Sequence, residues 1–237
     1  MQKIYKHHLF GEILIKKRAG SSRIRVAINP RKGISVTIPL LTSYSAAVSF
    51  IDEIEEKIVK VMAKQNEKMS KKMVEITPDT VIKTVCREIS FKPSDRAEIK
   101  IALYNNAAII EYPINADLSE LEPFLKEAVI KILRHEAKEF LPKRLKELAD
   151  KHGFTYNRLA LKNNSSNWGS CSGKNNINLN IHLMRTSAEI CDFVILHELA
   201  HLRHRNHGDE FHRLLNSLCG GRERELSAKL RKYSTFF

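Results

Sequence analysis

Five of the chain's ten histidines lie within the sixteen residues HELAHLRHRNHGDEFH, at positions 197–212. His197 and His201 are four residues apart, so in an α-helix they share one face at a separation of roughly 6 Å. Both imidazoles can then reach one metal ion, while Glu198 projects beside them and can accept a proton from water. This HExxH spacing predicts a zinc-dependent hydrolase with one Zn2+ per chain.

The segment that leads into this motif is apolar on nearly every side. Residues 187–204 are expected to form one helix, and its central portion CDFVILHELAHL is expected to be buried. Burying two histidines and a glutamate without partners costs several kcal/mol. A metal ion satisfies all three side chains at once, which favours the metal site over a basic helix that is merely rich in histidine.

The third ligand must come from beyond the HExxH helix. His207 can join the pair if the chain turns back after about residue 205, and the neighbouring Asn206 and Gly208 tolerate the backbone angles of such a turn. The alternatives are side chains from later helices, namely His212, Glu223 and Glu225.

Two further polar residues of the cluster are expected beside the ligands. His204 shares the face of His197, but in a continuous helix it lies about 10 Å away along the axis, so one ion cannot reach both. It is therefore expected to be a hydrogen-bonding neighbour of the ligands. Asp209 either orients an imidazole through its second nitrogen or simply begins the next helix.

A second polar stretch, SSNWGSCSGKNNINLNIHL, precedes the helix at residues 165–183. Its apolar residues alternate with asparagines, which predicts a strand that packs on one side and presents amides on the other. A strand beside a metal commonly pairs with an extended substrate, so Asn178 and Asn180 are expected to line the cleft, with a solvent-facing role as the alternative. Trp168 and Ser170 are candidates for the same cleft, although Trp168 also suits a packing role, and Cys171 reads as a small buried residue.

Four of these segments, NWGSCS, INLN, HELAH and NHGDEF, resemble the YgjP-like metallopeptidase family, a group of zincin type. The resemblance implies that His197, His201 and His207 are zinc ligands, that Glu198 is the catalytic base, and that the substrate is a peptide or protein. The sequence departs from the family at Asn167, because family members usually carry arginine just before the tryptophan.

The remaining pattern predicts an α+β protein, with a β-rich region at residues 1–115 that includes one long helix, followed by a zincin-like metal domain at 116–237. Alternating residues predict strands at 12–17, 22–28 and 33–39, and a helix that begins near Thr42 or Ser43. A second β segment covers 81–92, 97–104 and 107–114. A helix is expected over 117–152, bent or split at Pro142 and ended by Gly153. No internal repeat is evident.

The chain carries a net charge of +13, and one stretch concentrates it. No acid lies between Glu12 and Asp52, where there are seven basic residues: Lys16, Lys17, Arg18, Arg23, Arg25, Arg31 and Lys32. This region is expected either to attract polyanions such as nucleic acid, nucleotides or acidic membrane surfaces, or to be a solvated hairpin that serves solubility.

Other features indicate a cytoplasmic protein that does not enter a membrane. No apolar run approaches the roughly 20 residues of a membrane-spanning helix, and no secretory signal is evident at the N-terminus. The four cysteines form no CxxC pair and are typical of free thiols in a reducing compartment.

Three functions fit the motif. The first is a peptidase, in which three histidines leave one coordination position for a water whose pKa falls to about 7, and Glu198 takes its proton. The second is a metal-dependent hydrolase of nucleotide phosphoanhydrides, a nucleoside triphosphate pyrophosphatase, which the positive charge favours. The third is a non-enzymatic adaptor for nucleic acid or protein with a structural zinc, against which Glu198 argues because such a site needs no base.

Overall fold

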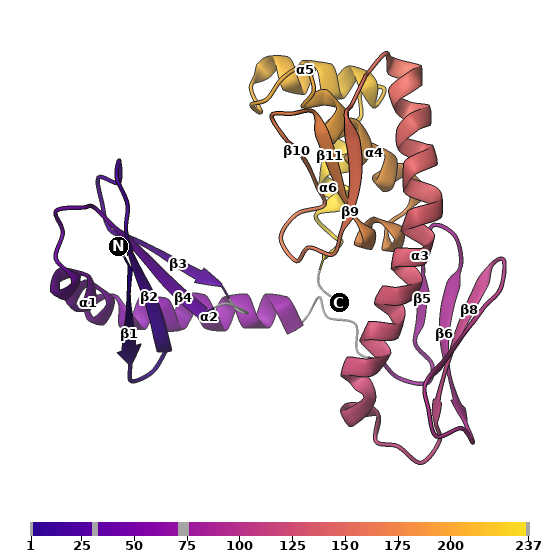
Figure 1. The fold of residues 1–237 in the computed structure, drawn as a ribbon, viewed down its shortest axis with the longest axis horizontal. Helices are drawn as coiled ribbons and strands as arrows, with labels where there is room; N and C mark the ends of the chain where they lie inside the picture. Colours follow the sequence, from indigo (N-terminus) through magenta and orange to yellow (C-terminus); the bar gives the residue numbers. More distant parts are fainter. Residues whose placement is uncertain (1, 30–32, 71–75, 236–237) are drawn as a thin grey trace. The chain divides into compact units, whose positions relative to one another are not determined.

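The structure, a computed structural model, describes residues 2–29, 33–70 and 76–235 (Figure 1). Its contacts divide the chain into two compact units, Met1–Met73 and Val74–Phe237. The middle of the turn NPRKG, with Arg31 and Lys32, lies outside the described residues. The expected α+β class is confirmed. No described helix is long and apolar enough to cross a membrane.

The N-terminal unit is a four-stranded sheet with two helices. The strands β1 (Gln2–His7), β2 (Gly11–Lys17), β4 (Gly33–Ile38) and β3 (Arg25–Asn29) lie in that order, with β2 and β4 parallel and both outer pairs antiparallel. The three predicted strands are present, whereas β1 was not predicted. Helices α1 (Tyr44–Glu53) and α2 (Glu55–Ser70) follow.

Strand alternation gives this sheet one apolar face, as the sequence predicts. Alternate residues in the middle of β2 and throughout β4 are buried, and these side chains pack against α1 and α2. The buried set is Ile13, Ile15, Ile34, Val36, Ile38, Ala47, Ile51 and Ile58. Ser43 begins α1, since its side chain accepts the backbone N–H of Ala46 at 3.1 Å.

The second unit opens with a sheet of the same topology. Its strands β5 (Val81–Lys83), β6 (Glu88–Ser94), β8 (Ala107–Pro113) and β7 (Lys100–Leu103) lie in that order, again with a parallel central pair and antiparallel outer pairs. In both units four strands are followed by a helix. A topological repeat therefore exists where the sequence shows none.

A single helix, α3 (Leu118–His152), runs through the second unit. Asp117 caps its start by accepting the N–H of Ser119 at 2.8 Å, and Gly153 ends it in the left-handed conformation, with φ of 66°. Pro142 lies inside the helix but does not split it. The fully buried Leu141 and Leu145 flank this turn, so their packing offsets the roughly 3 kcal/mol that an interior proline costs.

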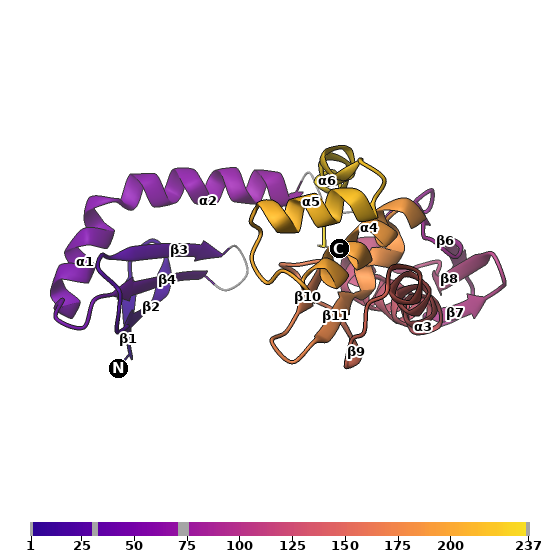
Figure 2. The same cartoon turned by 90° about the horizontal axis from the view of Figure 1, so that it is seen from above.

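The rest of the second unit builds around α3 (Figures 1 and 2). A three-stranded sheet has the order β10 (Gly169–Cys171), β11 (Asn176–Asn180) and β9 (Arg158–Lys162), so β10 lies at its edge. A 3-10 helix, η1 (Ile181–Arg185), leads into α4 (Ala188–Ala200). Helices α5 (Asp209–Leu218) and α6 (Glu223–Leu230) complete the unit.

The division between units falls after residue 73 and not near the expected boundary at 115. Residues of the β5–β8 sheet, including Ile89, Phe91 and Ile110, belong to one hydrophobic cluster with side chains of α3 and α4. Segments that share a core pack as one unit, so residues 74–115 belong with the C-terminal region. The boundary expected near residue 115 coincides with the loop between β8 and α3.

A buried ion pair joins this sheet to α3. Glu136 is fully buried, and its carboxylate lies 2.8 Å from Nε of Arg87 and accepts a hydrogen bond from the Thr84 hydroxyl at 3.0 Å. Burial raises the pKa of Glu136, although Thr84 and Arg87 act against that shift. The carboxylate is thus held in the core by two neighbours from the β5–β6 connection.

Replacing Arg87 by methionine tests this link. The Arg87→Met substitution leaves a buried carboxylate uncompensated, so the free energy of unfolding should fall by about 3 kcal/mol at pH 7 in urea titrations. This fall in the free energy of unfolding should be smaller at pH 5, because protonation then neutralises the unpaired carboxylate of Glu136. Arg87→Met/Glu136→Leu should recover most of the stability; equal urea midpoints for wild type and Arg87→Met would show that the pair contributes nothing.

Candidate metal centre

Helix α4 carries the HExxH motif through the core. Ser187 caps its start by accepting the N–H of Ile190 at 3.3 Å, and nine of its thirteen residues are buried. The helix ends at Ala200, with His201 as its last partly helical residue. It is therefore shorter than the predicted span of 187–204, and His204 lies in the following turn.

Three histidines converge at this helix end. The ring centroids of His197 and His201 are 4.9 Å apart, and His207, from the loop before α5, lies 5.1 Å and 4.6 Å from them. Nε2 of His207 is 3.1 Å from Nε2 of His197, and one ring nitrogen from each residue lies within 4.8 Å of the others. The structure thus brings together the three residues that the sequence nominated as ligands.

Because α4 ends early, the backbone carbonyl of His204 can accept a hydrogen bond from His201. Nδ1 of His201 donates to the carbonyl oxygen of His204 at 3.0 Å, which leaves the lone pair on Nε2 of His201. The imidazole of His204 instead lies 3.6 Å from the carboxylate of Glu210. His204 is therefore a neighbour of the ligands, as expected, but it contacts them with its carbonyl group.

Phe211 forms the floor beneath the three imidazoles. It is fully buried, and its ring centroid lies 4.9, 4.5 and 4.7 Å from those of His197, His201 and His207. Sequence reasoning assigned it no role. Two features of the sequence could have pointed to Phe211: it ends the segment NHGDEF, and it follows His207 by four residues. In the structure it lies on the buried side of α5.

Glu198 is the unpaired polar group of the site. It is 4% exposed, and its Oε2 has no hydrogen-bond partner. Burial raises the pKa of Glu198 to about 8. Burial also lowers the pKa of His197 to about 4, helped by the nearby His201 and His207, so the imidazole is neutral at pH 7.

The backbone of β10 lies directly against this carboxylate. A Cβ atom added at Gly169 would lie 2.6 Å from Oε1 of Glu198 and 2.8 Å from its Cδ. No side chain fits there unless Glu198 moves. Glycine at 169 therefore allows the edge strand to approach the candidate base closely.

The amide face of β11 is used within the protein. Asn178 donates from Nδ2 to the hydroxyl of Ser170 at 3.0 Å, across the pair of strands. Asn180 is 1% exposed, donates to the carbonyls of Asn164 and Asn167 at 2.7 and 2.8 Å, and caps η1 by accepting the N–H of His182. Asn180 therefore does not line the cleft, because its hydrogen bonds hold the loop before β10.

The loop itself is braced at both ends. Asn167 donates to the carbonyl of Gly169 at 2.9 Å, and the half-buried Trp168 packs on the main core. Arg205, after the HExxH helix, donates to the carbonyl of Ser172 at 2.7 Å and to Sγ of Cys171 at 3.4 Å. Cys171 is thus part of this brace and not of the histidine group.

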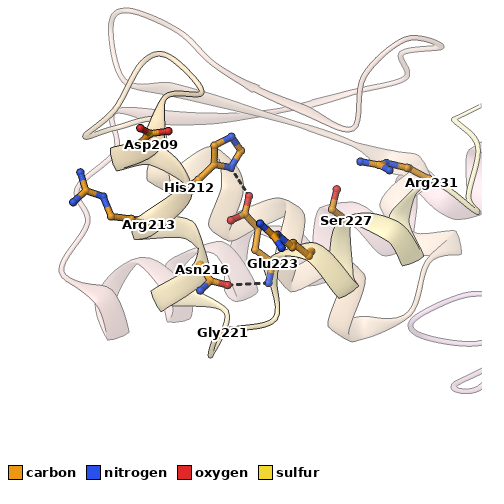
Figure 3. A pocket seen from close by; sticks show the side chains of 9 residues that line it. Asp209, His212, Arg213, Asn216, Gly221, Glu223, Ser227 and Arg231 are labelled. Carbon is orange, nitrogen blue, oxygen red and sulfur yellow. Dashed lines mark hydrogen bonds and ion pairs between the residues drawn. The ribbon is translucent and has the colours of Figure 1, made fainter.

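The alternative ligands of the sequence analysis are engaged elsewhere, and two of them, His212 and Glu223, line a groove of about 900 Å3 along α5 and α6 (Figure 3). Nδ1 of His212 lies 2.5 Å from a carboxylate oxygen of Glu223, as the dashed line shows. Glu225 pairs with Arg222 and Lys229 at 2.7 and 2.8 Å. Asp209 lines the groove as the first residue of α5, where a negative charge is favourable.

One other cluster of metal-binding side chains occurs among the described residues, formed by His7, His8 and Glu55. Nδ1 of His7 accepts the N–H of Leu9 at 3.2 Å, so a neutral His7 keeps its proton on Nε2. That nitrogen faces the carboxylates of Asp52 and Glu55 at 3.4 and 3.5 Å. We interpret this cluster as a polar contact between β1 and helices α1 and α2.

The residues at the end of α4 fit a metal ion. One ring nitrogen from each of three histidines lies within 4.8 Å of the others, and the buried Oε2 of Glu198, the residue after His197, lacks a hydrogen-bond partner. Imidazole nitrogens are the commonest protein ligands of zinc and related ions. An α+β unit with this arrangement is typical of metallohydrolases.

Comparison with known proteins gives the family. Residues 22–233 match the YgjP-like metallopeptidase domain, so the chain belongs to the YgjP-like metallopeptidase family and is a metallohydrolase. Comparison with curated proteins gives no match. One solved structure, the metallopeptidase zymogen of Methanocaldococcus jannaschii jannalysin, is 22% identical over 38% of this chain and 93% of its own, with a TM-score of 0.35. The family assignment depends on the domain match alone.

The contact between Gly169 and Glu198 predicts a sensitive position. Gly169→Ala should push the Glu198 carboxylate aside and lower kcat/KM by about 100-fold, because small misplacements of a reacting group cost that much. The bound-metal content should remain at the wild-type level. Gly173→Ala is the matched control, since a Cβ there meets nothing within 4 Å. Wild-type activity in Gly169→Ala would show that the strand does not position the carboxylate.

Proposed function

We propose that this protein is a zinc metallopeptidase in which His197, His201 and His207 hold the ion and Glu198 is the general base. The observation that carries the proposal is the convergence of three imidazoles, together with a buried carboxylate without a hydrogen-bond partner at Glu198, the residue that follows the first of them. Membership of a metallopeptidase family supports the same chemistry.

Zinc is the ion that this ligand set suits best. Three histidines with no thiolate in the group match a catalytic zinc site, which leaves a position open, and not a closed structural site. Burial lowers the pKa of both His197 and His201, so these ligands need not lose a proton at neutral pH before they bind. The hydrogen bond from Nδ1 of His201 to the carbonyl of His204 holds that ring in one tautomer.

When bound, the metal ion supplies a Lewis acid that polarises the scissile carbonyl and generates a nucleophile from water at neutral pH. Glu198 accepts the proton of the attacking water at its unpartnered carboxylate oxygen and passes it to the leaving amine. Burial raises the pKa of Glu198 to about 8, so both the protonated and the ionised carboxyl group are populated near neutral pH.

The edge strand β10 supports a peptide substrate over other hydrolase substrates. Within the described residues, no strand pairs with its outer edge, and its Gly169 touches Glu198. An extended peptide can add to such an edge through main-chain hydrogen bonds, which would bring a peptide bond beside the base. A nucleotide phosphoanhydride has no backbone to pair in this way, and it remains the competing substrate for the test below.

The ligand assignment predicts metal content. His207→Ala should lose tightly bound zinc, because two imidazoles alone do not complete the site. His212→Ala, the matched control on α5, should keep about one zinc per chain as measured by atomic emission after dialysis. A zinc content unchanged in His207→Ala and lowered in His212→Ala would move the third ligand to His212.

The base assignment predicts activity. Glu198→Gln keeps the size of the side chain but cannot take a proton, so hydrolysis of an unfolded protein should fall by about 100-fold to 10,000-fold while zinc remains bound. Wild type and variant would be assayed, both zinc-loaded, on unfolded casein and on the four nucleoside triphosphates.

Each outcome of that assay is decisive. Wild-type cleavage of casein that Glu198→Gln lacks supports the peptidase. Unchanged activity in the variant contradicts the role of Glu198. Hydrolysis of nucleoside triphosphates without cleavage of casein rejects the peptidase in favour of the phosphoanhydride hydrolase.

A further inference from the structure

The two units carry very different net charges. The N-terminal unit, residues 1–73, has 15 basic and 6 acidic side chains, a net charge of +9. The second unit, more than twice as long, has 25 and 21, a net charge of +4. Most of the chain's excess positive charge therefore belongs to the smaller unit, although that unit contains none of the proposed catalytic residues.

Within the N-terminal unit, the opposite charges lie on different layers. Five of its six acids belong to α1 and α2, and Glu12 is the only acid on the strands. The helices cover the apolar face of the sheet, so the other face of the sheet is nearly free of carboxylates. A polyanion that approaches this outer face meets little repulsion.

The outer face presents a row of polar side chains across all four strands. The register pairs Gln2 with Lys16, Lys16 with Thr37, and Thr37 with Arg25. Lys16 and Arg25 are exposed, and no carboxylate of the described residues forms an ion pair with either of them. Two strand spacings separate them, about 10 Å between backbones, with the Thr37 hydroxyl between them.

Further cations lie at the same end of the sheet. The loop between the end of β2 and the start of β3 carries Arg18 and Arg23, both exposed and without a carboxylate partner in the part of the chain that the structure describes. Lys17, by contrast, lies on the helix side, where its ammonium donates to the carbonyl of Leu40 at 2.9 Å and contacts the Tyr44 ring. Four cations are thus free to contact a ligand at this end of the outer face, namely Lys16, Arg18, Arg23 and Arg25.

The second sheet supplies an internal comparison because its topology is the same. In the equivalent row, Lys92 and Lys100 flank Glu111 of the central strand β8. There the two lysines have a carboxylate between them, and Glu111 also lies 3.4 Å from Arg96. In the N-terminal sheet the same position is Thr37, so the positive charge of the row is not offset.

We propose that the outer face of the N-terminal sheet binds nucleic acid through its phosphate backbone, with Lys16, Arg25 and the Thr37 hydroxyl as the central contacts. Phosphates are the anions that occur in long rows, and lysine, arginine and hydroxyl groups are their common partners. The next row across the sheet is Ile4, Leu14, Ser35 and Ala27, which contains no aromatic ring on which a base could stack. The binding is therefore independent of base sequence and sensitive to salt.

Binding is measured by fluorescence anisotropy with full-length protein, a labelled single-stranded RNA of about 20 nucleotides and a DNA duplex of about 20 base pairs, from about 50 to 200 mM KCl. Thr37→Glu reproduces the row of the second sheet and should weaken binding by about ten-fold or more, since it places a carboxylate between the two cations. Thr37→Gln is the matched neutral control and should stay within about two-fold of wild type.

A second pair of variants separates this face from net charge. Lys16→Gln/Arg25→Gln should lower the slope of log Kd against log salt by about two, one for each lost phosphate contact. Lys92→Gln/Lys100→Gln removes the same charge from the equivalent row of the second sheet and should leave the slope unchanged. All four positions are exposed, so these double variants should fold. They therefore still test the proposal if Thr37→Glu does not fold.

Three results would overturn the proposal. The first is equal loss of binding in the two double variants, which would mean that net charge alone acts. The second is equal binding by Thr37→Glu and Thr37→Gln. The third is binding of wild type to vesicles that contain phosphatidylserine, with no binding to either oligonucleotide at about 50 mM KCl.

Discussion

The constraint behind the metal centre is that α4 is a buried helix with a polar end. Nine of its thirteen residues are buried, yet its last turn carries the half-buried His197 and the buried Glu198. Such groups are stable in an apolar core only if partners satisfy them. The turn at His204, the return of His207 over Phe211, and the approach of β10 at Gly169 all bring groups to this polar end.

The same constraint explains why the surrounding loops are so firmly held. The buried amide of Asn180 fastens the segment before β10, and Arg205 fastens the segment after it by donating to the carbonyl of Ser172. Neither residue belongs to the histidine group. Both fix the strand that lies against Glu198, and a rigid surrounding structure is what keeps a reacting group within the small distances that catalysis requires.

Local features were predictable from the sequence, and those that depend on distant contacts were not. Helical spacing predicted that His197 and His201 share one face, and local preferences predicted a helix start at Thr42 or Ser43 and a helix end at Gly153, which the structure shows at Ser43 and Gly153. The uninterrupted helix at Pro142 depends on tertiary packing. The carbonyl contact of His204 depends on α4 ending early. The repeated sheet topology is invisible because strand order leaves no periodic trace in the sequence.

X-ray absorption spectroscopy of the zinc-loaded protein tests the metal centre most directly, because it reports the atoms bonded to the ion. The account predicts three imidazole nitrogens and one oxygen at about 2.0–2.1 Å, with no sulfur. A zinc–sulfur distance of about 2.3 Å would place Cys171 or another thiolate in the site. That result, or a shell with fewer than three imidazoles, would contradict the assignment of His197, His201 and His207.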